Sequence, residues 1–268
     1  MSRRPTAVAG HFYPDNPVQL RHLLDQLLQD MAPSQKRPRL IVVPHAGYIY
    51  SGKTAAFAYG SLKGHDYQRV LLVGPSHHVS FMGYAFSDVT HWETPLGEVA
   101  LDHYGMDQFL KTNPEIPAFL HPQPHEREHS LEVQVPFLQS VLKEGFRLIP
   151  VVYGRSEAKD LLKILEAFGD DETLIVISTD LSHFYEQSKA NELDKICCDA
   201  MVAMDAGGLE QCEACGRIGM QAAALYGRHH GLNTRMLSYR TSGDVVGDMS
   251  SVVGYASFLM TDNDTEDE

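Results

Sequence analysis

The run Arg39-Leu40-Ile41-Val42-Val43 decides the fold, together with a second run, Arg69-Val70-Leu71-Leu72-Val73. Each is a short apolar segment of the kind that forms a buried strand. Residues 51–62, which lie between them, have the pattern of a helix. Strand, helix and strand in this order predict two parallel strands joined by a crossover, because parallel neighbours need such a connection.

The same alternation continues along the chain. Further apolar runs predict strands at residues 146–152, 173–178, 235–239 and 252–260. Helical patterns follow Asn16-Pro17 and cover residues 156–168, 188–204 and 217–229. We therefore expect one α/β domain over residues 1–260, doubly wound, with a mostly parallel central sheet and helices on both faces. Two short runs within residues 84–101 predict a β-hairpin insertion.

Composition narrows the classes of partner. The net charge of −13 argues against nucleic acid or an anionic membrane surface as the main partner. No apolar run approaches the length of about 18 residues that a membrane helix needs, and the basic N-terminus lacks the apolar segment of a secretory signal. Residues 261–268 are strongly acidic and are predicted to be a disordered tail.

Four cysteines in 268 residues do not make a disulfide framework, so a reducing cytoplasm is the expected location. Cys212 and Cys215 form a C-x-x-C pair, but no second pair follows at zinc-ribbon spacing. Buried or incidental thiols are the favoured interpretation of these residues.

The fourteen histidines are the unusual feature of the composition. Several of them, with two aspartates, follow predicted strands: His45, His77, Asp180, His183 and Asp244. Ligands of open α/β sheets bind beyond the carboxyl ends of the strands, so these side chains are expected to converge. Two imidazoles and one carboxylate suit Fe(II), and a further unligated histidine could move protons. The alternative is that each histidine is an ordinary loop residue.

Several motifs resemble, in order, those of the Memo-like family, which in turn resembles the class III extradiol ring-cleaving dioxygenases with their non-haem Fe(II). The resemblance runs from Pro5 to Met260. Its motifs are Ala9-Gly10-His11-Phe12-Tyr13-Pro14, Pro44-His45-Ala46-Gly47-Tyr48-Ile49-Tyr50-Ser51-Gly52, Gly74-Pro75-Ser76-His77-His78, Glu128-His129-Ser130-Leu131-Glu132, Ser178-Thr179-Asp180-Leu181-Ser182-His183 and Cys215-Gly216-Arg217.

The resemblance implies roles for these residues. His45 and His77 correspond to the metal-binding histidines, and His183, with Asp180 beside it, corresponds to the acid–base histidine of the dioxygenases. Asp244 aligns where vertebrate Memo proteins carry a cysteine and the dioxygenases use a glutamate. Its carboxylate would complete a set of two histidine ligands and one carboxylate ligand, which favours iron, with copper or zinc as alternatives. Asp248 is the alternative third ligand. Cys215 could also approach the site, because it opens a matching motif.

Two other motifs suggest different functions. Residues 47–54 fit the phosphate-binding pattern G-x-x-x-x-G-K-[ST], with Lys53, but bulky tyrosines occupy positions where backbone amides must wrap phosphate. His125 and His129 fit the zinc-protease pattern H-E-x-x-H, which requires a continuous helix. Prolines close before it place His125 in an approach loop. His129 is then predicted to face the site alone, as a contact to ligand or substrate; a surface histidine is the alternative.

The sequence thus leaves two main functional classes for one pocket. The first is a non-haem iron oxidoreductase that acts on a small aromatic or chelating molecule. The second is a protein that binds metal or a peptide on the same fold without catalysis, since one fold hosts unrelated functions. An NTPase that uses Lys53 is a remote third.

Overall fold

The computed structural model describes residues 2–263. Its centre is a nine-stranded sheet with the strand order β10-β12-β2-β9-β3-β8-β4-β7, and β11 pairs with β12 outside this path. The strands are β2 (Pro38–Val43), β3 (Arg69–Pro75), β4 (Tyr84–Phe86), β7 (Ala118–Leu120), β8 (Arg147–Tyr153), β9 (Thr173–Ser178), β10 (His183–Tyr185), β11 (Leu232–Thr241) and β12 (Val252–Asp262).

Four neighbouring strands, β2, β9, β3 and β8, run parallel to one another. Their residues are almost all buried, as expected for strands that are covered on both faces. The outer strands are added in the opposite direction: β12 is antiparallel to β2, and β4 is antiparallel to β8. The predicted mostly parallel sheet is therefore confirmed.

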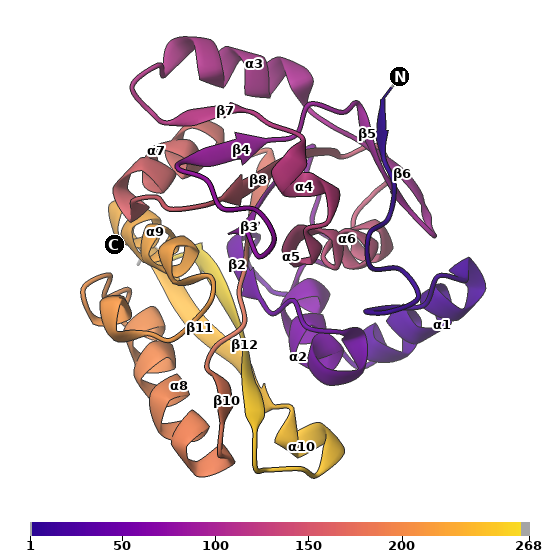
Figure 1. Cartoon of the computed structure of the whole chain (residues 1–268), viewed down its shortest axis with the longest axis vertical. Coiled ribbons are helices and arrows are strands. Elements are labelled where there is room, and N and C mark those ends of the chain that lie inside the picture. Colours follow the sequence, from indigo (N-terminus) through magenta and orange to yellow (C-terminus); the bar gives the residue numbers. More distant parts are fainter. Residues whose placement is uncertain (1, 264–268) are drawn as a thin grey trace.

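Helices cover both faces of this sheet (Figure 1). One group lies to the right of β2 and β3 in this view: α1 (Pro17–Leu28), α2 (Tyr48–Ser61), α5 (His129–Glu132) and α6 (Val135–Val141). The other comprises α7 (Ala158–Phe168), α8 (Gln187–Val202) and α9 (Arg217–His229). Short elements complete the chain: α3 (His103–Thr112), α4 (Gln123–Glu126), the 3₁₀ turn η1 (Gly208–Gln211) and α10 (Gly243–Val246). Across residues 2–263, no helix is both long and apolar enough to cross a membrane.

The predicted hairpin insertion is present as β5 (His91–Thr94) and β6 (Gly97–Ala100), which pair antiparallel. The two strands do not join the main sheet. They form a small separate sheet with β1 (Arg3–Arg4), which pairs parallel to β5. The N-terminus of the chain is therefore fixed against the insertion.

Two predictions need correction. The acidic tail was expected to begin at residue 261, but β12 continues to Asp262, because Thr261 pairs with Pro38 and Asp262 with Leu232; residues 264–268 lie outside the described residues. Cys212 was expected to be a free thiol, but it forms a disulfide with Cys197 of α8, with the two Cα atoms 5.2 Å apart.

Candidate metal site

Three loops at the carboxyl edge of the parallel strands carry the predicted site residues. His45 follows β2, His77 follows β3 and Asp180 follows β9, each two residues after the strand ends. Since β9 pairs with both β2 and β3, the three loops leave the same edge side by side. The topology thus brings together residues that are far apart in sequence.

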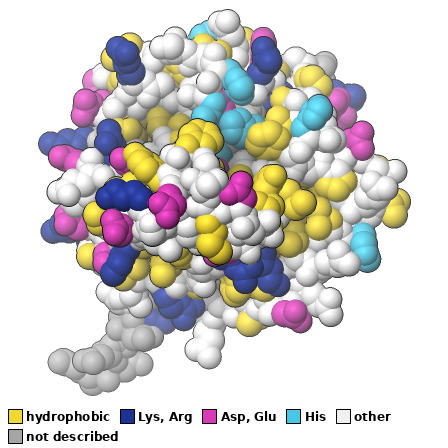
Figure 2. Space-filling view, turned by 60° about the horizontal axis from the view of Figure 1, so that its bottom comes forward, with side chains coloured by type: hydrophobic (Ala, Val, Ile, Leu, Met, Phe, Trp, Pro, Cys, Tyr) yellow, Lys and Arg dark blue, Asp and Glu magenta, His cyan; other side chains and the backbone are white. Residues whose placement is uncertain are grey.

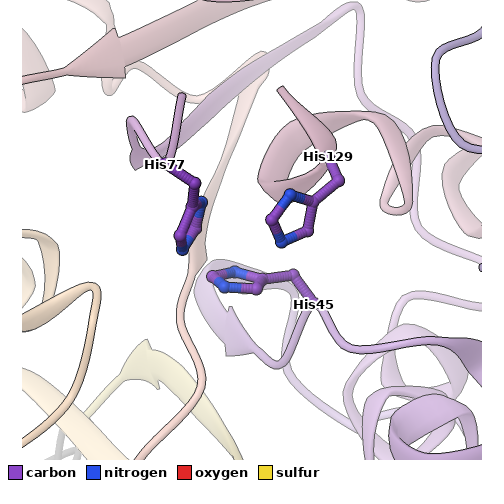
Figure 3. A group of neighbouring side chains, drawn as sticks. All are labelled: His45, His77 and His129. Atoms are coloured by element: carbon purple, nitrogen blue, oxygen red, sulfur yellow. The ribbon is translucent and has the colours of Figure 1, made fainter. Parts of the chain in front are cut away.

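A third imidazole joins the two predicted ones. His129, the first residue of α5, has its ring beside those of His45 and His77, and the three rings face a common centre (Figure 3). One ligand nitrogen from each of the three lies within 4.8 Å of the others. The ring centroids are 5.1 Å apart for His45 and His77 and 4.5 Å apart for His77 and His129. Three nitrogens at this spacing could hold a divalent metal ion.

The site lies at the surface of the molecule. His45 is buried, whereas His77 is partly exposed, so solvent reaches the group from the His77 side. In Figure 2 histidine side chains gather on one face beside hydrophobic ones. A small molecule could therefore approach the three rings directly.

The tautomer of His45 follows from its hydrogen bonds. Its Nδ1 lies 2.9 Å from Oγ of Ser178. That hydroxyl donates its single proton to the carbonyl of Ser130, at 2.6 Å, and accepts from the amide of Gln134, at 3.0 Å. Ser178 must therefore accept from Nδ1 of His45, because it has no second proton to give. The lone pair of His45 is on Nε2, where a metal can bind it.

Glu128 orients His77 in the same way. Its carboxylate accepts from Nδ1 of His77 at 2.8 Å and from the backbone N–H of His77 at 2.6 Å. Nε2 of His77 is thus the free nitrogen. Carboxylates and hydroxyls that fix the second ring nitrogen of a metal-ligating histidine are typical of protein metal sites. Neither Glu128 nor Ser178 was predicted to take part; only the position of Glu128 next to His129 in a matched motif pointed to it.

The pKa values favour neutral rings. Burial, with a smaller contribution from the neighbouring His77, lowers the pKa of His45 to about 3. Burial also lowers the pKa of His129 to about 4. Burial opposes the ionisation of Glu128, but its hydrogen bonds with His77 outweigh this and lower its pKa to about 2. At neutral pH His45 and His129 are therefore neutral imidazoles, the form that binds metal.

Two further donors lie next to His45. Sγ of Cys215 is 3.3 Å from its Nε2, and Oδ2 of Asp180 is 3.9 Å from the same nitrogen. Asp180 is also fixed, because its Oδ1 accepts from the backbone N–H of His45 at 2.7 Å. Burial raises the pKa of the Cys215 thiol to about 12, so it is protonated in the metal-free protein. The approach of Cys215 to the site is as expected from its motif.

His183 stands at the edge of the group. It begins β10 and pairs with Val253 of β12. It follows Asp180 by three residues, and β12, the strand with which it pairs, lies next to β2. His78 is exposed and is not part of the group of three, but its ring centroid lies 5.9 Å from that of His129.

The structure does not bring Asp244 to the three histidines. Thr241, at the end of β11, pairs with Gly254, whereas β12 meets β2 only from Phe258 onward. The β11–β12 hairpin therefore projects beyond β2 and carries α10 past the site, as Figure 1 shows. There Asp244 accepts from the backbone N–H of Thr241, and Asp248 accepts from Ser250. Among the described residues, the group that could hold a metal ion consists of His45, His77 and His129 and includes neither aspartate.

The two competing motifs do not have the geometry that they require. Helix α2 begins at Tyr48, so the residues that would wrap a phosphate before Lys53 are helical themselves. The H-E-x-x-H segment is broken between α4 and α5, so His125 and His129 are not on a continuous helix. His125 lies in α4 rather than in a loop, and its ring nitrogen contacts the carbonyl of Ala85 instead of the site.

Comparison with known proteins agrees with the resemblance of the motifs. The family model described as "Memo-like protein" matches residues 4–259. A MEMO1 family protein of Aquifex aeolicus is 36% identical over 97% of this chain and 99% of its own. MEMO1 family proteins of Archaeoglobus fulgidus and Nitrosopumilus maritimus are 35% and 32% identical, each over 96% of this chain and 98% of their own. The chain therefore belongs to the Memo-like family.

Proposed function

We propose that the protein binds one divalent transition-metal ion through Nε2 of His45, Nε2 of His77 and a ring nitrogen of His129. The observation that carries this proposal is the orientation of the first two rings. Their Nδ1 atoms are held by Ser178 and Glu128, so the lone pair of each ring is on Nε2. The Cys215 thiol lies 3.3 Å from Nε2 of His45, so a metal bound there would displace this contact or take the sulfur as a ligand. Metal-ligating histidines almost always have their second ring nitrogen held in this way.

Fe(II) is the metal that we propose first. Imidazoles bind iron, copper and zinc, so the fourth donor decides among them. Asp180 offers an oxygen donor 3.9 Å from Nε2 of His45, which would give the mixed nitrogen and carboxylate set of non-haem iron. Cys215, at 3.3 Å, would favour copper or zinc if its thiol were the donor instead.

The proposed reaction class is oxidation of a small aromatic or chelating molecule, as in the class III extradiol dioxygenases. Bound Fe(II) would supply coordination positions for such a molecule and for O₂. His183 would take a proton from the substrate hydroxyl and return it, because its ring is not committed to the metal. Asp180 holds the His45 loop in place, because its carboxylate accepts from the backbone N–H of His45. A cytoplasmic location, where Cys215 would stay reduced, is part of the proposal; the Cys197–Cys212 disulfide is the observation that speaks against it, because a reducing compartment disfavours disulfides.

The alternative is a binding protein without catalysis, which would hold the metal and a peptide at the same open face. Two observations distinguish the classes: oxygen uptake and metal content. The Fe(II)-loaded protein is mixed with a panel of catechol-type compounds in an oxygen electrode. The enzyme proposal predicts oxygen uptake with at least one compound. His183→Ala should abolish this uptake at unchanged metal content. The control His22→Ala, which removes an exposed histidine of α1, should retain it. Absence of uptake at full metal occupancy would favour the binding protein.

A further inference from the structure

One short helical turn holds both a candidate ligand and its support. Residues 128–132 begin with Glu128, which binds His77, and His129, which faces the site. The turn is closed at its start because Glu128 also accepts from the backbone N–H of Ser130, at 2.9 Å. At its other end Glu132 points away from the three histidines. The contacts of Glu132 therefore help to fix the position of His129, which lies in the same turn.

Glu132 is held by the N-terminal segment, residues 4–13, which we name the N-terminal strap. Its carboxylate is 1% exposed and accepts hydrogen bonds from the backbone N–H groups of Ala7, at 2.7 Å, and Val8, at 2.9 Å. The hydroxyl of Tyr13 donates to it at 2.7 Å. Arg4 completes the set with an ion pair at 2.7 Å. Four donors from one segment thus bind a single buried carboxylate.

Arg4 reaches further than its ion pair. Its Nε donates to the carbonyl of His125 at 2.6 Å, and a terminal nitrogen donates to the carbonyl of Glu128 at 2.8 Å. The guanidinium also lies over the ring of Trp92, 4.4 Å from its centroid. Arg4 therefore binds the backbone both within α4 and at Glu128, so it holds the segment that directly precedes His129. The planar guanidinium group has several N–H donors in fixed directions, so one arginine can donate to all of these acceptors at once.

The far end of the strap contacts the site itself. The ring of Phe12 lies 4.9 Å from that of His129. The carbonyl of Phe12 accepts from the backbone N–H of Tyr48, three residues after His45, at 2.8 Å. The strap therefore touches the His129 turn and the His45 loop, and it fixes one relative to the other.

We infer that Arg4 and Glu132 are positioning residues of the metal site: by docking the strap on residues 128–132, they hold His129 where it can bind a metal. The inference rests on the proposed metal binding. Neither side chain is among the three grouped histidines, and an arginine that only neutralised Glu132 would not need its bonds to the carbonyls of His125 and Glu128, which precede His129. Outer partners of this kind typically change metal affinity 10- to 100-fold.

Arg4→Lys is the variant that separates position from stability. Lysine keeps the buried positive charge beside Glu132, but its single nitrogen cannot also serve the carbonyls of His125 and Glu128. The matched control is Arg3→Lys on the same strand, since Arg3 is exposed and its ion pairs with Glu93 and Glu98 lie on the surface. Circular dichroism checks that each variant is folded. If Arg4→Lys does not fold, Arg4→Met combined with Glu132→Gln replaces it, because this pair leaves no unpaired buried charge.

The experiment is an anaerobic titration with Co²⁺, followed by its visible ligand-field spectrum, on wild type, Arg4→Lys, Arg3→Lys, His129→Ala and the double variant Arg4→Lys/His129→Ala. We expect Arg4→Lys to bind Co²⁺ at least about tenfold more weakly, with the spectral change of His129→Ala. The double variant should bind no more weakly than His129→Ala, because both changes remove the same ligand.

Affinity and spectrum of Arg4→Lys equal to those of wild type would overturn the inference, and so would independent, additive losses in the double variant. Failure of the wild type to bind Co²⁺ is a different result: it would remove the proposed metal site, and this inference with it.

Discussion

Glu128 forms two hydrogen bonds with His77, because its carboxylate accepts from both the ring Nδ1 and the backbone N–H of that histidine. The same carboxylate caps α5, the helix that begins with His129. One buried side chain thus links two of the three candidate ligands. This link explains why a glutamate is buried at 1% exposure beside the histidines.

Glu128→Gln should weaken metal binding by 10- to 100-fold. Glutamine has one acceptor oxygen, so it cannot receive hydrogen bonds from the ring and the backbone of His77 as the carboxylate does. A competition titration with a chromophoric zinc chelator measures the change. Glu126→Gln, an exposed neighbour on α4, is the control and should bind as wild type does. Equal affinity in the two variants would show that Glu128 does not orient a ligand.

Phe184→Gly should stabilise the protein by about 1 kcal/mol. Phe184 has a φ of 66°, in the left-handed region that favours glycine, and its side chain is 76% exposed, so little burial is lost. Urea denaturation measures the free energy of unfolding. Phe184→Ala keeps a Cβ atom and should gain nothing. If the alanine variant is as stable as the glycine variant, the backbone at this position is not strained.

The metal-free protein should lose stability as the pH falls from 7 to 5. Burial lowers the pKa of His45 and of His125 to about 3, from an ordinary 6.5. Below pH 6.5 the unfolded chain therefore binds protons that the folded chain does not, which favours unfolding. At pH 5 this costs about 2 kcal/mol for each buried histidine.

Urea denaturation at several pH values, after dialysis against a chelator, tests this loss. His125→Gln keeps a donor for the carbonyl of Ala85 and removes one titrating group, so its stability should fall less steeply. A free energy of unfolding that stays constant between pH 7 and pH 5 would contradict the buried, neutral state of these rings.

The central strands could be predicted from sequence because burial on both faces leaves an unbroken apolar run. Thr173–Ser178 and the helix Arg217–His229 have the predicted bounds, and β2, β3 and β8 differ by at most two residues at either end. The positions of His45 and His77 followed from these strands, since the carboxyl ends of parallel strands meet at one edge.

The third ligand could not be predicted in the same way. How far β11 and β12 extend past β2 depends on their pairing with each other, which no local sequence pattern encodes. The prediction of Asp244 as the third ligand used only its position after a strand, so it could not take this distance into account. His129 was predicted to face the site, but only as a contact to ligand or substrate. Its place among the three nitrogens depends on α5 packing beside β3, a contact between segments distant in sequence.

The central claim is a metal ion on three histidines, and metal content after anaerobic purification tests it most directly. Inductively coupled plasma mass spectrometry is applied to wild type and to His45→Ala, His77→Ala, His129→Ala and Asp244→Ala. The account predicts about one transition-metal ion per chain in wild type, with iron favoured, strong loss in the three histidine variants and retention in Asp244→Ala. No metal in the wild type, even after reconstitution with Fe(II), Cu(II) or Zn(II), would contradict it.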